Sequence, residues 1–368
     1  MLLTVTLCAG GVSRLVSPTP APQLNRDKLE YKTFFFSFLR EGNFKKNKDL
    51  EVNKIYHDDW MNNQLPDKSV QLIIADPPYY KVKGDFDFIW KSFDDYLQDV
   101  ERWAIECKRV LADNGTLYWY GDAKNIAYAQ VIFDKHFNLL NSLVWENTND
   151  HKQQIRFNIG LRTFAPLTER ILVYQKNDDY HDTVRLAIKD VQDYLNTLIT
   201  RDELAKILLE IGNCRNFESA RQNANNILSQ KSAKPQLITG LQYDLIKADK
   251  ITHLELTEMY EAKRKYYDGL RRPFNNERHY GDVIRIPNYE TGDYAHDTIK
   301  PEKLTRELIL ISSRPQDLIL IPFVGSGTEC AMSAKENRNF IGFEIDAKHF
   351  KTATDRTEII KSQPSLFF

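Results

Sequence analysis

Cysteine is scarce in this sequence, neither sign of charge is in excess, and there is no long apolar run. Four cysteines (Cys8, Cys107, Cys214 and Cys330) are spread over 368 residues without a CxxC pair, which indicates neither a cysteine-based zinc site nor a disulfide framework. We therefore expect a reducing cytoplasm as the compartment. No run is long and apolar enough to cross a bilayer, so no membrane partner is expected.

The formal net charge of −1 removes any global basic field that would point to nucleic acid, although a basic face can be local. A hydrophobic content of 42% and a charged content of 27% are typical of a soluble globular protein. The first residues lack a charged start, so no signal peptide is expected. The Ser/Pro/Ala-rich stretch from residue 17 to 22 predicts a partly flexible extension over residues 1–50.

Apolar runs alternate with helical patterns from about residue 51 to 180 and again from 282 to 368. The continuous apolar run Val70–Ala75 is typical of a buried strand, and Phe93–Leu111 has helical spacing. Strands are also expected at 55–57, 116–120, 139–145, 169–175, 318–321 and 340–344, and helices at 123–136, 301–312, 328–337 and 347–361. This alternation predicts an α/β fold with a Rossmann-like parallel sheet and helices on both faces.

Residues 181–281 contain no convincing strand. Helices are predicted at 184–198, 201–211, 243–248 and 254–270, and Thr200 with Glu203 forms a capping-box pattern before the second of these. A mainly helical inserted domain therefore divides one α/β domain into two parts, residues 51–180 and 282–368.

A glycine-rich segment, FVGSGTECA, follows the predicted strand at 318–321 and begins a helix. Gly325 and Gly327 let the backbone approach a ligand, and the helix N-terminus favours an anionic group. A P-loop would need Lys where Thr328 stands, which disfavours a nucleoside triphosphate. The next strand ends in Glu344, an acid suited to ribose hydroxyls. The pattern predicts a pocket for a nucleoside with an anionic group; a simple tight turn is the alternative.

The DPPY motif, residues 76–79, follows the buried strand Val70–Ala75. If this strand lies beside residues 318–321, both carboxyl ends share one edge of the sheet, where ligands of open α/β folds bind. Asp76 and the Pro77 carbonyl can accept hydrogen bonds from an amine, and Tyr79 can stack on a planar base. Pro77 and Pro78 hold these acceptors rigidly. The motif predicts attack by an amine on an electrophilic carbon.

In this order the motifs resemble the β group of S-adenosylmethionine-dependent DNA amino-methyltransferases, adenine-N6 type, in which DPPY precedes FxGxG. Three further stretches resemble family blocks, namely IYHDDWMNNQLPDKSVQLIIADPPY, TERILVYQK and HDTIKPEKL. The resemblance covers roughly residues 53–176 and 282–361. It implies a circularly permuted methyltransferase sheet, with the helical insertion in the place of the target-recognition region.

The resemblance also implies the chemistry. A base flipped out of duplex DNA is held by Asp76 and Pro77 and stacked on Tyr79, and its amino nitrogen attacks the sulfonium methyl group. The product is S-adenosylhomocysteine, and no metal is needed. Asp59 would contact the adenine of the cofactor, and the other implied cofactor residues are His296, Lys300, Phe323, Gly325, Ser326, Gly327, Thr328 and Glu344. Asp in the DPPY motif favours adenine N6; cytosine-N4 enzymes mostly carry Ser there.

Two positions depart from the family pattern. Ile321 stands where the family usually has an Asp that supports the amino group of the cofactor, and Asp58 stands where Gly is frequent. A cytosine-N4 methyltransferase and a DNA-binding protein with a decayed cofactor site therefore remain alternatives, although the intact motifs argue against decay.

Basic and aromatic residues interleave in residues 262–278, AKRKYYDGLRRPFNNER, a composition suited to phosphate contacts and stacking. A solvated helix end is the alternative. Residues 202–234 have the pattern of a helix-turn-helix unit with Gly212 at the turn. The candidate contacts to double-stranded DNA are Lys152, Arg156, Arg162, Lys263, Arg264, Lys265, Arg271 and Arg272. A homodimer and a cognate restriction enzyme are further candidate partners.

Overall fold

The computed structural model describes residues 50–82, 87, 89–148, 164, 167–176, 180–212, 214–229, 237–238, 258–288 and 299–362. The predicted extension at residues 1–50 lies outside the described residues except for Leu50, and so does the predicted helix at 243–248.

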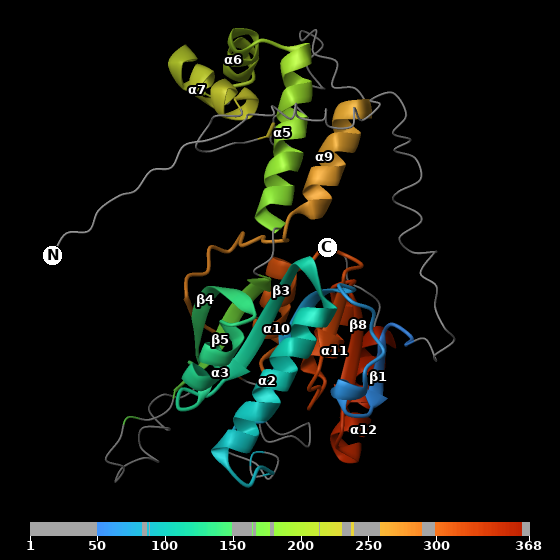
Figure 1. Cartoon of the computed structure of the whole chain (residues 1–368). Coiled ribbons are helices and arrows are strands. Elements are labelled where there is room, and N and C mark those ends of the chain that lie inside the picture. Colours follow the sequence, from blue (N-terminus) through green and yellow to red (C-terminus); the bar gives the residue numbers. More distant parts are fainter. Residues whose placement is uncertain are drawn as a thin grey trace, which may run out of the picture. The chain divides into compact units, whose positions relative to one another are not determined.

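An eight-stranded sheet in the order β1-β8-β7-β2-β3-β5-β4-β6 forms the centre of the α/β part (Figure 1). Its strands are β1 (Lys54–His57), β2 (Val70–Ala75), β3 (Leu111–Gly121), β4 (Phe137–Glu146), β5 (Thr168–Lys176), β6 (Val283–Arg285), β7 (Leu318–Ile321) and β8 (Asn339–Glu344). As predicted, β2 pairs in parallel with β7, with Leu72 opposite Ile319. The two motif-bearing segments therefore end at the same edge of the sheet.

The sheet is mixed, which corrects the prediction of a parallel sheet. Strands β1, β8, β7, β2 and β3 are parallel, whereas β5 runs antiparallel to both β3 and β4. No helix is predicted between β4 and β5, and a direct return of the chain produces an antiparallel pair. The three-residue strand β6, which pairs in parallel with β4, was not predicted because it is too short for a pattern.

Alternate residues of the central strands enter two separate cores, as the twofold repeat of a strand requires. On one face Ile73 and Trp119 pack with α2 (Phe93–Val110) and α3 (Ile126–Phe133). On the other face Leu72 and Tyr118 pack with α10 (Glu302–Ser312), α11 (Thr328–Lys335) and α12 (Ala347–Ser362). The predicted covering of both faces by helices is confirmed.

The inserted segment has a core of its own. Its described helices are α5 (Tyr180–Leu198), α6 (Arg201–Glu210), α7 (Phe217–Leu228) and α9 (Glu258–Leu270). Leu195, Leu204 and Tyr260 are fully buried within this cluster. The capping box of Thr200 and Glu203 is present, and Gly212, with φ of 72°, makes the turn that separates α6 from α7.

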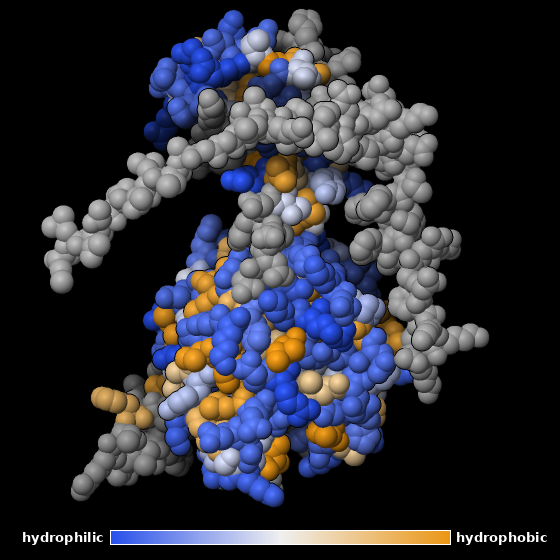
Figure 2. Space-filling view, in the orientation of Figure 1, coloured by the Kyte–Doolittle hydropathy of each residue, from blue (hydrophilic) through white to orange (hydrophobic). Residues whose placement is uncertain are grey.

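Apolar residues on the visible surface of the α/β part occur singly or in small groups among hydrophilic ones (Figure 2). The large apolar side chains of the central strands are instead buried in the two cores.

Substitution of the α2 N-cap provides a test of this fold. The Ser92 hydroxyl accepts a hydrogen bond from the Asp95 amide at 3.1 Å, and the Asp95 carboxylate accepts one from the Ser92 amide at 3.0 Å. We expect Ser92→Ala to lower the free energy of unfolding by about 1 kcal/mol in urea denaturation. Ser92→Asp, which keeps a capping oxygen, should lose much less; equal losses would contradict the capping role.

Candidate active site

A cleft of about 820 Å³ lies at the carboxyl edge of the sheet and is lined by both motifs. It brings together residues that are far apart in the chain, which are Asp59, Asp76, Pro77, Pro78, Tyr79, Lys300, Phe323, Gly325, Ser326 and Glu344. This convergence follows from the parallel pairing of β2 with β7.

The glycine loop has the backbone that its residues allow. Gly325 has φ of 51° and Gly327 has φ of 82°, both in the left-handed region that favours glycine. A Cβ atom on Gly327 would lie 2.8 Å from the Ala353 Cα, so α12 also requires glycine here. Gly327 and Thr328 are not among the residues that line the cleft; the buried Thr328 hydroxyl accepts a hydrogen bond from Arg356 Nη1 at 2.8 Å.

One end of the cleft is built by the acid that ends β8. Glu344 Oε2 accepts a hydrogen bond from the Gly325 amide at 2.7 Å, and its Oε1 accepts one from the Asp346 amide at 2.9 Å. Burial raises the pKa of Glu344. Each carboxylate oxygen keeps further acceptor capacity for a ligand hydroxyl.

The same end of the cleft includes the Asp59 segment. The Asp59 carboxylate caps the short helix η1 (Trp60–Asn62) by accepting a hydrogen bond from the Met61 amide at 2.9 Å. The ring of Phe323 packs edge-on against Trp60, with ring centroids 6.0 Å apart. These contacts place Asp59, the predicted adenine contact, beside the glycine loop.

The other end of the cleft contains a buried ion-pair network around Asp76. Lys300 Nζ lies 2.7 Å from Asp76 Oδ2 and 3.1 Å from Glu169 Oε2, and the lysine side chain is 5% exposed. Burial alone would lower the pKa of Lys300, but the two carboxylates outweigh it and raise that pKa. The lysine is therefore charged and holds Asp76 in place. The sequence analysis did not predict Glu169 as a site residue. The feature that could have indicated it is the acid near the start of the TERILVYQK block.

Tyr79 is turned toward Asp76. Its hydroxyl donates a hydrogen bond to Asp76 Oδ1 at 2.6 Å, and its amide donates one to Asp87 Oδ1 at 2.5 Å. The tyrosine is 8% exposed, and burial, followed by the charge of Asp76, raises its pKa. In this arrangement both oxygens of Asp76 already have a partner, Tyr79 on one and Lys300 on the other.

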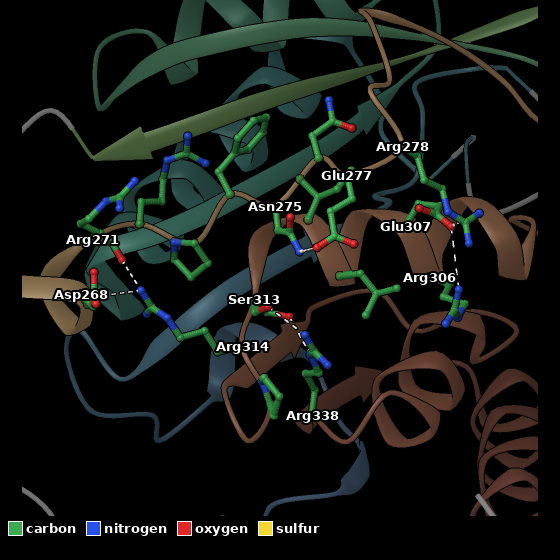
Figure 3. A pocket seen from close by; sticks show the side chains of 17 residues that line it. Asp268, Arg271, Asn275, Glu277, Arg278, Arg306, Glu307, Ser313, Arg314 and Arg338 are labelled. Carbon is green, nitrogen blue, oxygen red and sulfur yellow. Dashed lines mark hydrogen bonds and ion pairs between the residues drawn. The ribbon is translucent and has the colours of Figure 1, made fainter. Parts of the chain in front are cut away.

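The predicted DNA contacts Arg271 and Arg272 lie away from this cleft. They line a second pocket of about 680 Å³, in which Arg314 Nη2 donates to the carbonyls of Asp268 and Arg271 at 2.6 and 2.8 Å (Figure 3). Arg314 precedes β7 and therefore lies at its amino end. Arg272 donates to Thr116 at 3.3 Å. The structure thus places this pair at the edge of the sheet opposite to Asp76.

The other predicted basic residues fall into two groups. On α9, Lys263 Nζ lies 2.5 Å from Asp190 Oδ2 of α5, and Arg264 donates to the carbonyl of Ile238. Lys265 is exposed on the same helix. The remaining candidates, Lys152, Arg156, Arg162 and His296, lie outside the described residues. Lys152, Arg156 and Arg162 belong to the segment between Asn147 and Leu167 in the sequence. The Asn147 amide donates a hydrogen bond to the Leu167 carbonyl at 3.2 Å, so the described ends of this segment lie beside Glu169 at the carboxyl edge of the sheet.

The described residues contain no group of three or more His, Cys, Asp and Glu side chains that could hold a metal ion. No helix within the described ranges is long and apolar enough to cross a membrane.

Comparison with known proteins assigns the chain to a family. The family model described as DNA methylase matches residues 70–355, which is most of the chain, so the protein belongs to this DNA methylase family. Among relatives, it is 26% identical over 319 residues to the DNA adenine methyltransferase YhdJ of Escherichia coli (strain K12), with 84% of each chain covered.

Two further comparisons have similar coverage. The chain is 26% identical over 313 residues to the type II methyltransferase M1.MboII of Moraxella bovis, covering 83% of this chain and 96% of the relative. The solved structure of PvuII DNA methyltransferase (cytosine-N4-specific) matches with a TM-score of 0.47 and 14% identity, over 85% of this chain and 87% of that one.

Removal of the buried lysine tests the ion-pair network. Lys300→Ala leaves Asp76 and Glu169 together without a cation, and we expect the free energy of unfolding to fall by about 3 kcal/mol. The exposed Lys303→Ala serves as the control in urea denaturation, and equal stabilities of the two variants would contradict the network.

Proposed function

We propose that the protein is a site-specific DNA methyltransferase that transfers the methyl group of S-adenosylmethionine to N6 of an adenine flipped out of duplex DNA. The observation that carries this proposal is the shared cleft, in which the glycine loop and Glu344 lie at one end and Asp76 at the other. Family membership establishes the DNA methylase class, and the geometry supports the assignment of roles within it.

The residues present fit an adenosyl cofactor. Glu344 has acceptor capacity for ribose hydroxyls, and Asp59 and Phe323 flank the place for the adenine. When bound, S-adenosylmethionine supplies a methyl group already activated by the sulfonium charge. Gly325 and Ser326 line the same cleft as Glu344 and Asp76, so they and Lys300 would border the amino acid part.

The role of Asp76 follows from its partners. Lys300 holds the Asp76 carboxylate in place, so it can accept a hydrogen bond from the target amino group, and the Pro77 carbonyl can accept a second. The flanking prolines make this arrangement rigid, so little reorganisation is needed when the amine arrives.

The Tyr79 hydroxyl donates a hydrogen bond to Asp76 Oδ1 in this structure, so the Tyr79 ring is turned toward Asp76 and away from a stacking position. Stacking on the target base therefore requires the Tyr79 side chain to turn away from Asp76. A rotation of the Tyr79 side chain frees this oxygen and exposes the ring for stacking on the base. Replacement of the tyrosine hydroxyl by the target amine conserves the number of hydrogen bonds made by Asp76.

Adenine N6 is favoured over cytosine N4 as the target. The chain carries Asp in its DPPY motif, and its relatives include a protein named DNA adenine methyltransferase. The type II names of other relatives support a restriction-modification setting with a cognate restriction enzyme. We extend the proposal to a cytoplasmic enzyme that contacts DNA phosphates through Lys152, Arg156 and Arg162, and to a homodimer.

The methylated product distinguishes the two amino-methylation reactions. The full chain is incubated with labelled S-adenosylmethionine and unmethylated genomic DNA, and the DNA is digested to nucleosides. We expect the label in N6-methyladenine. Label in N4-methylcytosine would establish the cytosine reaction, and DNA binding without transfer would support a decayed cofactor site.

An isosteric change of the proposed catalytic carboxylate tests the mechanism. We expect Asp76→Asn to lower kcat by about 10²- to 10³-fold, because the charged acceptor for the amino group is lost. The affinity for S-adenosylhomocysteine, measured by calorimetry, should not change. Asp355→Asn, an exposed acid on α12, is the matched control. An active Asp76→Asn enzyme would refute the proposed role.

A further inference from the structure

The first turn of α11 places a carboxyl group in the cleft that the mechanism above does not use. Glu329 is 5% exposed and lines the cleft together with Asp76, Lys300 and Ser326. Its side chain accepts a long hydrogen bond of 3.5 Å from the Thr305 hydroxyl and one from its own backbone amide, and it forms no ion pair with any described residue. A buried carboxylate without a counterion is costly in free energy, so its retention at the cleft needs a reason.

The acids around Glu329 outnumber the cations among the described residues. Lys300 is already paired with both Asp76 and Glu169. Arg356, the other cation that interacts electrostatically with Glu329, donates instead to Thr328 Oγ1 and to Glu302, each at 2.8 Å. Burial, followed by the charge of Asp76, raises the pKa of Glu329 to about 7. This part of the cleft therefore favours the entry of a cation.

A structural explanation from the helix alone is incomplete. An acid in the first turn is favoured by the helix dipole, but an exposed side chain would gain this without the cost of burial. The acid expected by family resemblance at position 321 is also missing, since Ile321 is fully buried in the apolar core. The sequence thus has no acid on β7 and an acid on the helix that follows it.

We propose that Glu329 binds the α-ammonium group of the amino acid part of the methyl donor. This inference rests on the proposed function. The glycine loop that leads into α11 begins beside Glu344, the ribose end of the cleft, and Glu329 lies among the groups near Asp76. A donor that extends from Glu344 toward Asp76 would bring its cationic amino acid part to Glu329. Glu329 is then a residue that determines the affinity and orientation of the donor.

A pair of ligands isolates this contact. Calorimetric titrations of the wild-type chain and of Glu329→Gln use S-adenosylhomocysteine and an analogue in which hydrogen replaces the amino group, 5′-adenosyl-4-thiobutyrate. We expect Glu329→Gln to bind S-adenosylhomocysteine about 10- to 100-fold more weakly, the range of a charge-assisted hydrogen bond. Both proteins should bind the analogue equally. Glu358→Gln, an exposed acid on α12, is the matched control.

Each other outcome overturns the inference in a recognisable way. An equal loss of affinity for both ligands would assign Glu329 a structural role, and unfolding in urea would show the accompanying instability. Unchanged affinity for both ligands with reduced methyl transfer would place Glu329 at the target base. If the wild-type chain binds neither ligand, the proposed function itself fails together with the inference. If it binds both and Glu329→Gln matches it throughout, only the inference fails.

Discussion

The parallel pairing of β2 with β7 is the constraint on which the site depends. Leu72 and Ile319 are opposite each other in the sheet, although the helical insertion separates them in the chain. Because both strands end at one edge, the rigid DPPY segment and the glycine loop share a cleft. An insertion of this length is tolerated because it enters and leaves the α/β part as a separately packed cluster with its own core.

Electrostatics organise the cleft into two ends. At one end, backbone amides of Gly325 and Asp346 hold the Glu344 carboxylate. At the other end, Lys300 is buried between Asp76 and Glu169, and these three residues come from three different segments of the sequence. A buried cation between two acids is stable only as a unit, so the network fixes the acceptor for the target amine and also links the two parts of the α/β domain.

The arginines around the second pocket lie away from the cleft. Two arginines join the end of α9 and the segment after it to the α/β part. Arg272 donates to Thr116 of β3, and Arg314, which precedes β7, donates to the carbonyls of residues 268 and 271. They attach the inserted helices to the amino edge of the sheet. The segment whose described ends lie at the carboxyl edge, beside Glu169, is instead the one with Lys152, Arg156 and Arg162.

Local sequence determined the elements except the short strand β6, and it determined the two motifs and their order, because apolar periodicity, prolines and glycines act over a few residues. It predicted the β2–β7 neighbourhood and both covered faces of the sheet. Only tertiary structure decided that β5 is antiparallel, that Glu169 joins Lys300 and that Arg271 lies opposite the cleft. It also decided that Glu329 enters the cleft while Ile321 enters the core. These features depend on strand direction and on contacts between distant segments, which no local pattern encodes.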